Sequence, residues 1–248
     1  MNHIASLFFS TLVLCGLSLL PINDARAQIA KPDETFRTRF RIIVWNAGQP
    51  AGICYRKDGK LINISALSQS SRSKFHDYSG PTTMLLYPLS SIKSTKSEAE
   101  LEQQPIASVI FPPSVKYPLV LLVPNKGGPY PYRGIVFDDD PTVFPFKSYL
   151  FVSFSGTRVA TSIGDDRFIL EPLQTHLLTS ERKNLNLRMA ISLENGADWR
   201  IIKDDFYPNW SGFRTVFFLI DSVKEGRPYI DIRSLYEAEA SWNDAVKR

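Results

Sequence analysis

Cysteine is scarce in this sequence, and its scarcity limits how the fold can be stabilised. The 248 residues include two cysteines, Cys15 and Cys54. Cys15 lies in an N-terminal segment that we expect to be removed, so the mature chain keeps Cys54 alone. A lone cysteine forms no intramolecular disulfide, which removes the roughly 2–5 kcal/mol that such a bridge contributes to exported domains. We therefore expect the fold to depend on its hydrophobic core, with Cys54 buried in it and an intermolecular disulfide as the alternative.

Histidine is scarce too, and this argues against a metal centre. The sequence has three histidines, of which His76 and His176 remain after the N-terminal segment is removed. They lie in different halves of the chain, and neither pairs with Cys54 at the spacing of a zinc site. The one dense carboxylate run, residues 138–140, lacks the alternating spacing of an EF-hand loop, so we interpret it as the solvated start of a linker. The sequence predicts no metal site and no cofactor, with a weak calcium site at residues 138–140 as the alternative.

The motifs of common enzymes are missing as well. There is no Gly-x-Ser-x-Gly nucleophile motif and no complete phosphate-binding loop. Glycoside hydrolysis needs only two suitably spaced carboxylates, for which Asp165-Asp166, Asp204-Asp205 and Asp231 are candidates. Asp165-Asp166 falls in a predicted hairpin turn, which accounts for it without catalysis. We therefore predict that the protein is not an enzyme, and a carboxylate-based hydrolase remains an alternative.

Only the N-terminus carries a long apolar run. Residues 4–20 are apolar, Pro21 ends the run, and Ala25 and Ala27 supply the small residues that a signal peptidase reads. We predict a signal peptide, residues 1–27, cleaved after Ala27, and a periplasmic or secreted mature protein. A membrane-spanning helix needs about 20 apolar residues, more than this run contains. An uncleaved anchor is still an alternative, because Lys and Arg are missing from the segment before the run.

The charge of the chain is moderately positive. The formal net charge is +4 and the pI is about 9.0. In an exported protein, such a charge favours anionic envelope polymers or lipid head groups as partners, and not nucleic acid.

What the sequence has in abundance is short β-prone stretches. Runs rich in Val, Ile, Phe, Tyr and Leu recur between Gly, Pro, Asn and Asp, which is typical of an all-β protein. The candidate strands are residues 39–45, 52–56, 60–65, 83–89, 106–111, 119–123 and 134–138 in the first half, and 149–154, 158–163, 167–171, 185–193, 199–203, 215–221 and 229–233 in the second.

The two halves have similar patterns, which suggests a tandem duplication. Residues 40–48 match residues 148–156, and residues 118–124 match residues 215–221. A hairpin turn follows the first match in each half, at Asp58-Gly59 and at Gly164-Asp165. The period of about 100 residues is the size of one sandwich domain. We predict two tandem immunoglobulin-like β-sandwich domains and a short C-terminal helix. The predicted boundaries are residues 28–140 and 148–234 for the domains, 141–147 for the linker and 235–248 for the helix.

One candidate binding feature is a stripe of arginines. Arg37, Arg39 and Arg41 alternate with apolar residues on the first predicted strand, so they share one face at spacings of about 7 Å. Guanidinium groups bind sulfate, phosphate and uronate through paired hydrogen bonds. The alternative is a solvated face that protects a sheet edge.

Aromatic residues in predicted loops are the second candidate feature. Tyr130 and Tyr132 lie in a proline-rich loop, and Tyr207 and Trp210 lie in a second loop. Amphipathic rings in loops suit contacts with sugars or proteins, although they also fold back onto a domain's own core.

The functional prediction is accordingly a general one. We expect a non-catalytic, envelope-associated binding or structural module with an envelope protein as its possible partner. The alternative is binding of an anionic polysaccharide or another cell-envelope polymer through the arginines and aromatics.

Overall fold

The computed structural model describes most of the chain beyond the predicted signal peptide. The described residues are 35–45, 52–64, 71–90, 105–125, 127–179, 185–195, 198–209 and 212–247. The predicted signal peptide, residues 1–27, lies outside them. The chain from Thr35 onward forms one compact unit. Within the described ranges, no helix has both the length and the apolar character needed to cross a membrane.

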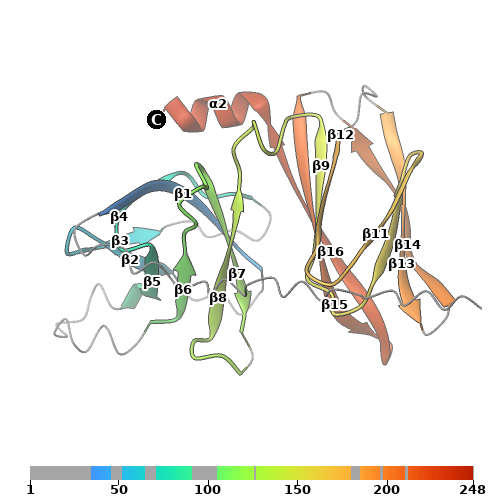
Figure 1. Ribbon diagram of the computed structural model, residues 1–248, viewed down its shortest axis with the longest axis horizontal. Helices are drawn as coiled ribbons and strands as arrows, with labels where there is room; N and C mark the ends of the chain where they lie inside the picture. The colour runs from blue at the N-terminus through green and yellow to red at the C-terminus, as the bar shows by residue number, and fades with distance from the viewer. Residues whose placement is uncertain are drawn as a thin grey trace, which may run out of the picture. The chain divides into compact units, whose positions relative to one another are not determined.

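The described chain consists mostly of strands, which confirms the all-β prediction (Figure 1). The first half contains β1 (Phe36–Val44), β2 (Ile53–Lys57), β3 (Lys60–Ile64), β4 (His76–Gly80), β5 (Thr83–Pro88), β6 (Ala107–Ile110), β7 (Pro118–Pro124) and β8 (Tyr132–Asp138). The second half contains β9 (Ser148–Ser153), β10 (Val159–Ile163), β11 (Asp166–Leu170), β12 (Thr175–Thr179), β13 (Leu185–Asn195), β14 (Asp198–Asn209), β15 (Phe213–Lys224) and β16 (Arg227–Ala238). The helix α2 (Glu239–Lys247) follows β16 directly.

The strand order of the second half repeats that of the first, strand for strand. The first half has the sheets β4-β1-β7-β8 and β3-β2-β5-β6, and the second has β12-β9-β15-β16 and β11-β10-β13-β14. Each half also contains one parallel pair at the same place in this order, β1 with β7 and β9 with β15.

This order differs from the predicted immunoglobulin arrangement. An immunoglobulin domain has antiparallel sheets and places its first two strands in the same sheet. Here β1 and β2 lie in different sheets, and β1 pairs in parallel with β7. Alternating hydrophobicity reveals a strand and its buried face, whereas the choice of partner strand depends on contacts distant in sequence.

Three hydrophobic cores separate the sheets. One lies between the two sheets of the first half, and a second lies between the two sheets of the second half. The third core joins β1 and β7 to β9 and β15, so parts of these four strands are buried on both faces. Burial on both faces explains why β7 and residues 216–220 of β15 are apolar without alternation.

The sequence matched β1 to β9 residue by residue, and the register of strand pairing shifts that match by one residue. Ile42 pairs with Val120, and Phe151 pairs with Phe217. If β7 is matched to β15 as the sequence suggests, Ile42 corresponds to Phe151 and not to Leu150. A shift of one residue exchanges the two faces of a strand, so the register decides which residues of β9 correspond to the arginines of β1.

Two strands were not predicted from the sequence. They are β4 and β12, each of which is the edge strand beside the first strand of its half. Both are short and polar in part, so neither has the apolar alternation by which the other strands were identified.

The predicted linker, residues 141–147, lies in the segment between β8 and β9. The interpretation of residues 138–140 as its solvated start is wrong, because Asp139 and Asp140 are 2% and 5% exposed. The predicted start of the helix also differs from the structure. Strand pairing continues to Ala238, so the helix begins at Glu239 and not at residue 235. Trp242 of α2 packs on Phe75 and Tyr117 of the first half, with ring centroids 5.6 and 5.2 Å apart.

Candidate functional site

The three arginines of the predicted stripe lie in different environments along β1. Phe40 faces the first core, so strand alternation directs the arginines to the opposite face. The guanidinium carbons of Arg39 and Arg41 each lie 4.9 Å from the ring centroid of Phe75. Arg37 is exposed, whereas the side chain of Arg39 is 36% exposed and that of Arg41 is 4% exposed.

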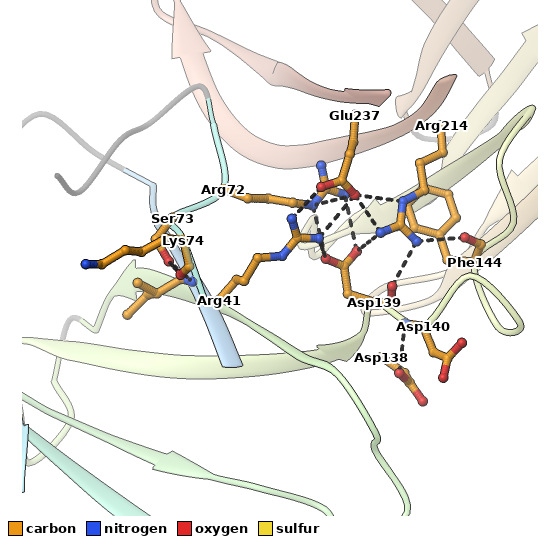
Figure 2. A network of polar contacts seen from close by, with 11 residues as sticks. Arg41, Arg72, Ser73, Lys74, Asp138, Asp139, Asp140, Phe144, Arg214 and Glu237 are labelled. Carbon is orange, nitrogen blue, oxygen red and sulfur yellow. Dashed lines mark hydrogen bonds and ion pairs between the residues drawn. The ribbon is translucent and has the colours of Figure 1, made fainter. Parts of the chain in front are cut away.

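Arg41 belongs to a group of buried charges, which we call the buried arginine cluster: Arg41, Arg72, Arg214, Asp139 and Glu237. Figure 2 shows the three guanidinium groups around the two carboxylates. Arg41 forms ion pairs with both Asp139 and Glu237. The Nε of Arg72 lies 3.2 Å from Oδ2 of Asp139 and 3.7 Å from Oε2 of Glu237. The Nε of Arg214 donates to Oε2 of Glu237 over 2.9 Å.

The cluster holds one more positive than negative charge, and its surroundings stabilise that excess. Burial by itself raises the pKa of Glu237, but attraction to Arg72, Arg41 and Arg214 outweighs burial and lowers it to about 2. The ring of Trp242 lies 4.7 Å from the guanidinium carbons of both Arg41 and Arg214, a cation–π geometry.

The buried arginine cluster joins the two halves of the chain. Arg41 and Asp139 come from the first half and the segment after it, whereas Arg214 and Glu237 lie on β15 and β16. The prediction that Arg41 binds an external anion is therefore not supported. Its guanidinium is covered by the second half and by the helix, which period-2 alternation alone does not reveal.

The other two arginines line an open hollow, which we call the cationic hollow. Its volume is about 510 Å³. Arg37 and Arg39 form one wall, Lys57 and Asp58 come from the β2–β3 hairpin, and Asp77 comes from β4. The remaining lining residues are Thr38, Tyr78 and Ser79.

The β2–β3 turn has the geometry that its sequence predicts. Asp58 and Gly59 both have positive φ, 48° and 77°, as a tight hairpin turn of the mirror-image type requires. This turn fixes the end of β2, and so places Lys57 and Asp58 at the cationic hollow.

Arg39 is held in the wall of the hollow by two polar contacts. Its Nε lies 3.4 Å from Oδ1 of Asp77, and its Nη1 donates to the main-chain oxygen of Val246 over 3.1 Å. A guanidinium has five N–H donors, so these contacts leave donors for a ligand.

A second, more apolar hollow adjoins the cationic one. Its volume is about 590 Å³, and the two hollows share Asp58, Tyr78 and Ser79. Pro81 and Met84 line it, and the hydroxyl of Tyr78 donates to the main-chain oxygen of Pro81 over 2.7 Å. Burial raises the pKa of Tyr78 to about 12, so its hydroxyl remains a donor at neutral pH.

Of the predicted loop aromatics, the described ones, Tyr130, Tyr132 and Tyr207, do not line either hollow. Tyr132 begins β8 and packs on the first core, and Tyr130 is half-buried beside it. Tyr207 lies in β14 and not in a loop, with its ring 5.0 Å from that of Phe217 in an edge-to-face contact. Trp210 lies outside the described residues.

Both His76 and His176 pack against aromatic rings. His76 is buried in β4, and burial is the main reason why its pKa is lowered to about 4. The ring of His176 stacks on Phe168 with centroids 3.9 Å apart. In the described ranges, no group of three or more His, Cys, Asp or Glu residues is arranged to hold a metal ion.

None of the predicted carboxylate candidates lines either hollow. Asp166 is exposed on β11. Asp205 forms an ion pair with Lys203 at 3.1 Å, and Asp231 forms one with Arg233 at 3.6 Å.

Sequence reasoning missed the buried arginine cluster. Its members are spread from residue 41 to residue 237, and no spacing rule connects them. The run at residues 138–140 was its one visible sign. Asp139 enters the cluster, and Oδ1 of Asp140 accepts hydrogen bonds from the main chain and hydroxyl of Thr142 over 2.9 and 3.0 Å.

No protein-family model matches this chain, and no curated protein sequence is significantly similar to it.

Proposed function

We propose that the protein is an exported, non-catalytic binding module of the cell envelope that holds an anionic group of a polysaccharide in the cationic hollow. One observation carries the proposal: Arg37, Arg39 and Lys57 converge on one open hollow from two strands. Guanidinium groups bind carboxylate and sulfate through paired, charge-assisted hydrogen bonds. Export is inferred from residues 1–27, and it makes envelope polymers the relevant anions.

The repeated strand order supports a duplicated sandwich as the scaffold of this module. Matching Ile42 to Phe151 places Ser148 at the position of Arg39 and Leu150 at that of Arg41. The second half therefore lacks the arginines of the first at these positions. We propose that duplication supplied the two sandwiches and that binding belongs to the first.

Binding titrations with two polyanions test the proposal. Polygalacturonate and dextran sulfate are titrated into the mature protein at about 0.05 M and about 0.5 M salt, because binding between exposed charges weakens with salt. We expect Arg37→Ala and Lys57→Ala each to weaken binding about three- to tenfold at low salt.

Two exposed arginines of the second half provide matched controls. Arg167→Ala and Arg227→Ala remove the same charge far along the chain from the hollow residues. We expect both to bind as the wild type does. Equal losses in all four variants would show that net charge, and not the hollow, attracts the polymer.

A hydrolase is the second candidate, because Asp58 and Asp77 line the same hollow. Paired carboxylates are the minimal equipment for glycoside hydrolysis. Prolonged incubation with polygalacturonate followed by a reducing-end assay separates the two functions. Turnover that disappears in Asp77→Asn would favour the enzyme, whereas binding without turnover favours the module.

An envelope protein is the other partner that the sequence predicts. Crosslinking of the mature protein in its native envelope fraction, followed by pull-down, tests this alternative. A stoichiometric protein partner that Arg37→Ala does not release would place the main interaction outside the cationic hollow.

A further inference from the structure

We infer that helix α2 supports the anion-binding site from outside the cationic hollow, because its last turn positions Arg39 in the wall of that hollow. The inference rests on the proposed function, since it identifies what orders one cation of that site. Arg39 is the arginine of β1 that both lines the hollow and touches the helix.

Three contacts from different elements define the position of the Arg39 guanidinium. Nη1 donates to the main-chain oxygen of Val246 over 3.1 Å, and Nε lies 3.4 Å from Oδ1 of Asp77. The guanidinium carbon lies 4.9 Å from the ring centroid of Phe75. Val246 is in the last turn of α2, where unpaired carbonyl groups carry partial negative charge and attract cations.

The helix is itself anchored one turn earlier by Trp242. This side chain is 5% exposed, and its ring lies edge-on to Tyr117 and Phe75 at 5.2 and 5.6 Å. Trp242 and Val246 are four residues apart, so they lie on the same face of the helix. Phe75 therefore contacts both the helix anchor and Arg39, which couples the position of the helix to that of the guanidinium.

Preorganisation gives the sign of the expected effect. An arginine loses side-chain entropy when a ligand orders it, and a side chain ordered beforehand loses less. Arg39 is 36% exposed, so without Val246 it samples other rotamers. Displacing the last turn of α2 is therefore expected to weaken anion binding, although no residue of the helix lines the hollow. Reciprocity requires that a bound anion in turn stabilises the docked helix.

Two variants displace the last turn in different ways. Ala245→Pro disrupts it and leaves every side-chain charge in place, because proline removes a helix hydrogen bond and clashes with the preceding turn. Truncation after Ala245 removes the Val246 carbonyl together with two cations. Its matched control is the full-length double variant Lys247→Ala with Arg248→Ala, which removes the same charges and keeps that carbonyl.

The probe is an oligogalacturonate of defined length, titrated at about 0.05 M salt. We expect Ala245→Pro to bind about three- to tenfold more weakly than wild type, and the truncated chain to bind more weakly than the double variant by a similar factor. In an Arg39→Ala background, both differences should disappear, since the coupling acts through that guanidinium.

Hydrogen exchange of the amides of residues 239–247 is the second measurement. A helix that only stabilises the fold would exchange at the same rate with and without the ligand. Oligogalacturonate should slow exchange of these amides in the wild type but not in Arg39→Ala. If the wild type binds the probe through Arg37 and Lys57 while Ala245→Pro binds equally well, this inference is wrong and the proposed function stands. Failure of the wild type to bind the probe overturns both.

Discussion

The buried imidazole of His76 is expected to make the protein lose stability in mild acid. His76 is 5% exposed, and its ring packs against Phe40 and Tyr55 at centroid distances of 5.6 and 6.3 Å. Burial, and then repulsion from Lys74, lower its pKa to about 4, against partial opposition from Asp77. The folded protein therefore favours the neutral ring, and the unfolded chain binds the proton more readily.

The size and pH window of the effect follow from the two pKa values. An ordinary histidine titrates near 6.5, so unfolding takes up a proton between about pH 6.5 and pH 4. The contribution of the neutral ring to the free energy of unfolding is fully present above pH 6.5. It decreases as the pH falls through that window, and the total loss is about 3 kcal/mol.

Urea denaturation at a series of pH values measures this loss. His76→Gln replaces the imidazole with a group that does not titrate, so its free energy of unfolding should change by about 3 kcal/mol less than that of the wild type between pH 6.5 and pH 4. His176→Gln is the matched control, because it removes the histidine that stacks on Phe168 outside the first core. A wild-type pH slope in His76→Gln would refute the reasoning.

Three further predictions concern the contacts between the halves and the packing of the sheets. Glu237→Gln leaves the three arginines of the cluster with the carboxylate of Asp139 alone, so urea denaturation should show a loss of about 3–5 kcal/mol. Because arginines lower its pKa to about 2, Glu237 should stabilise the wild type less and less as the pH falls from 4.5 to 2, a dependence absent from Glu237→Gln. Trp242→Ala should cost about 3–5 kcal/mol and speed proteolysis of α2, whereas unchanged stability would contradict its anchoring role. Gly134→Ala places a Cβ 2.5 Å from Cγ2 of Val109, so a lower melting temperature is expected. An unchanged melting temperature would show that β6 and β8 move apart at no cost to make room for the methyl group.

Local physics made part of this fold predictable. Strands such as β2 and β10 were identified because β-prone residues alternate between turn residues, and both properties are local. The Asp58-Gly59 turn was predicted because few residue pairs tolerate two positive φ angles in succession.

The candidate site was predictable only in part. The sequence identified Arg37 and Arg39 correctly as members of one face, and the hollow contains both. Asp77 was not identified, because β4 was not recognised as the neighbour of β1. Lys57 was not identified, because it ends β2, which belongs to a different sheet from β1. Arg41 has the same periodicity as the other two arginines, and only the packing of the second half separates it from them.

The sequence by itself determined the all-β character of the chain, its two similar halves and its tight turns, because these depend on residue identity and on neighbours a few positions away. The tertiary structure decided the parallel pairing of β1 with β7, the third core between the halves and the burial of Arg41. It also decided the contact between Arg39 and the C-terminal helix, 207 residues away. The third core forms because parts of four strands bury both faces, and the identity of a covering surface is not encoded in the alternation of any one strand.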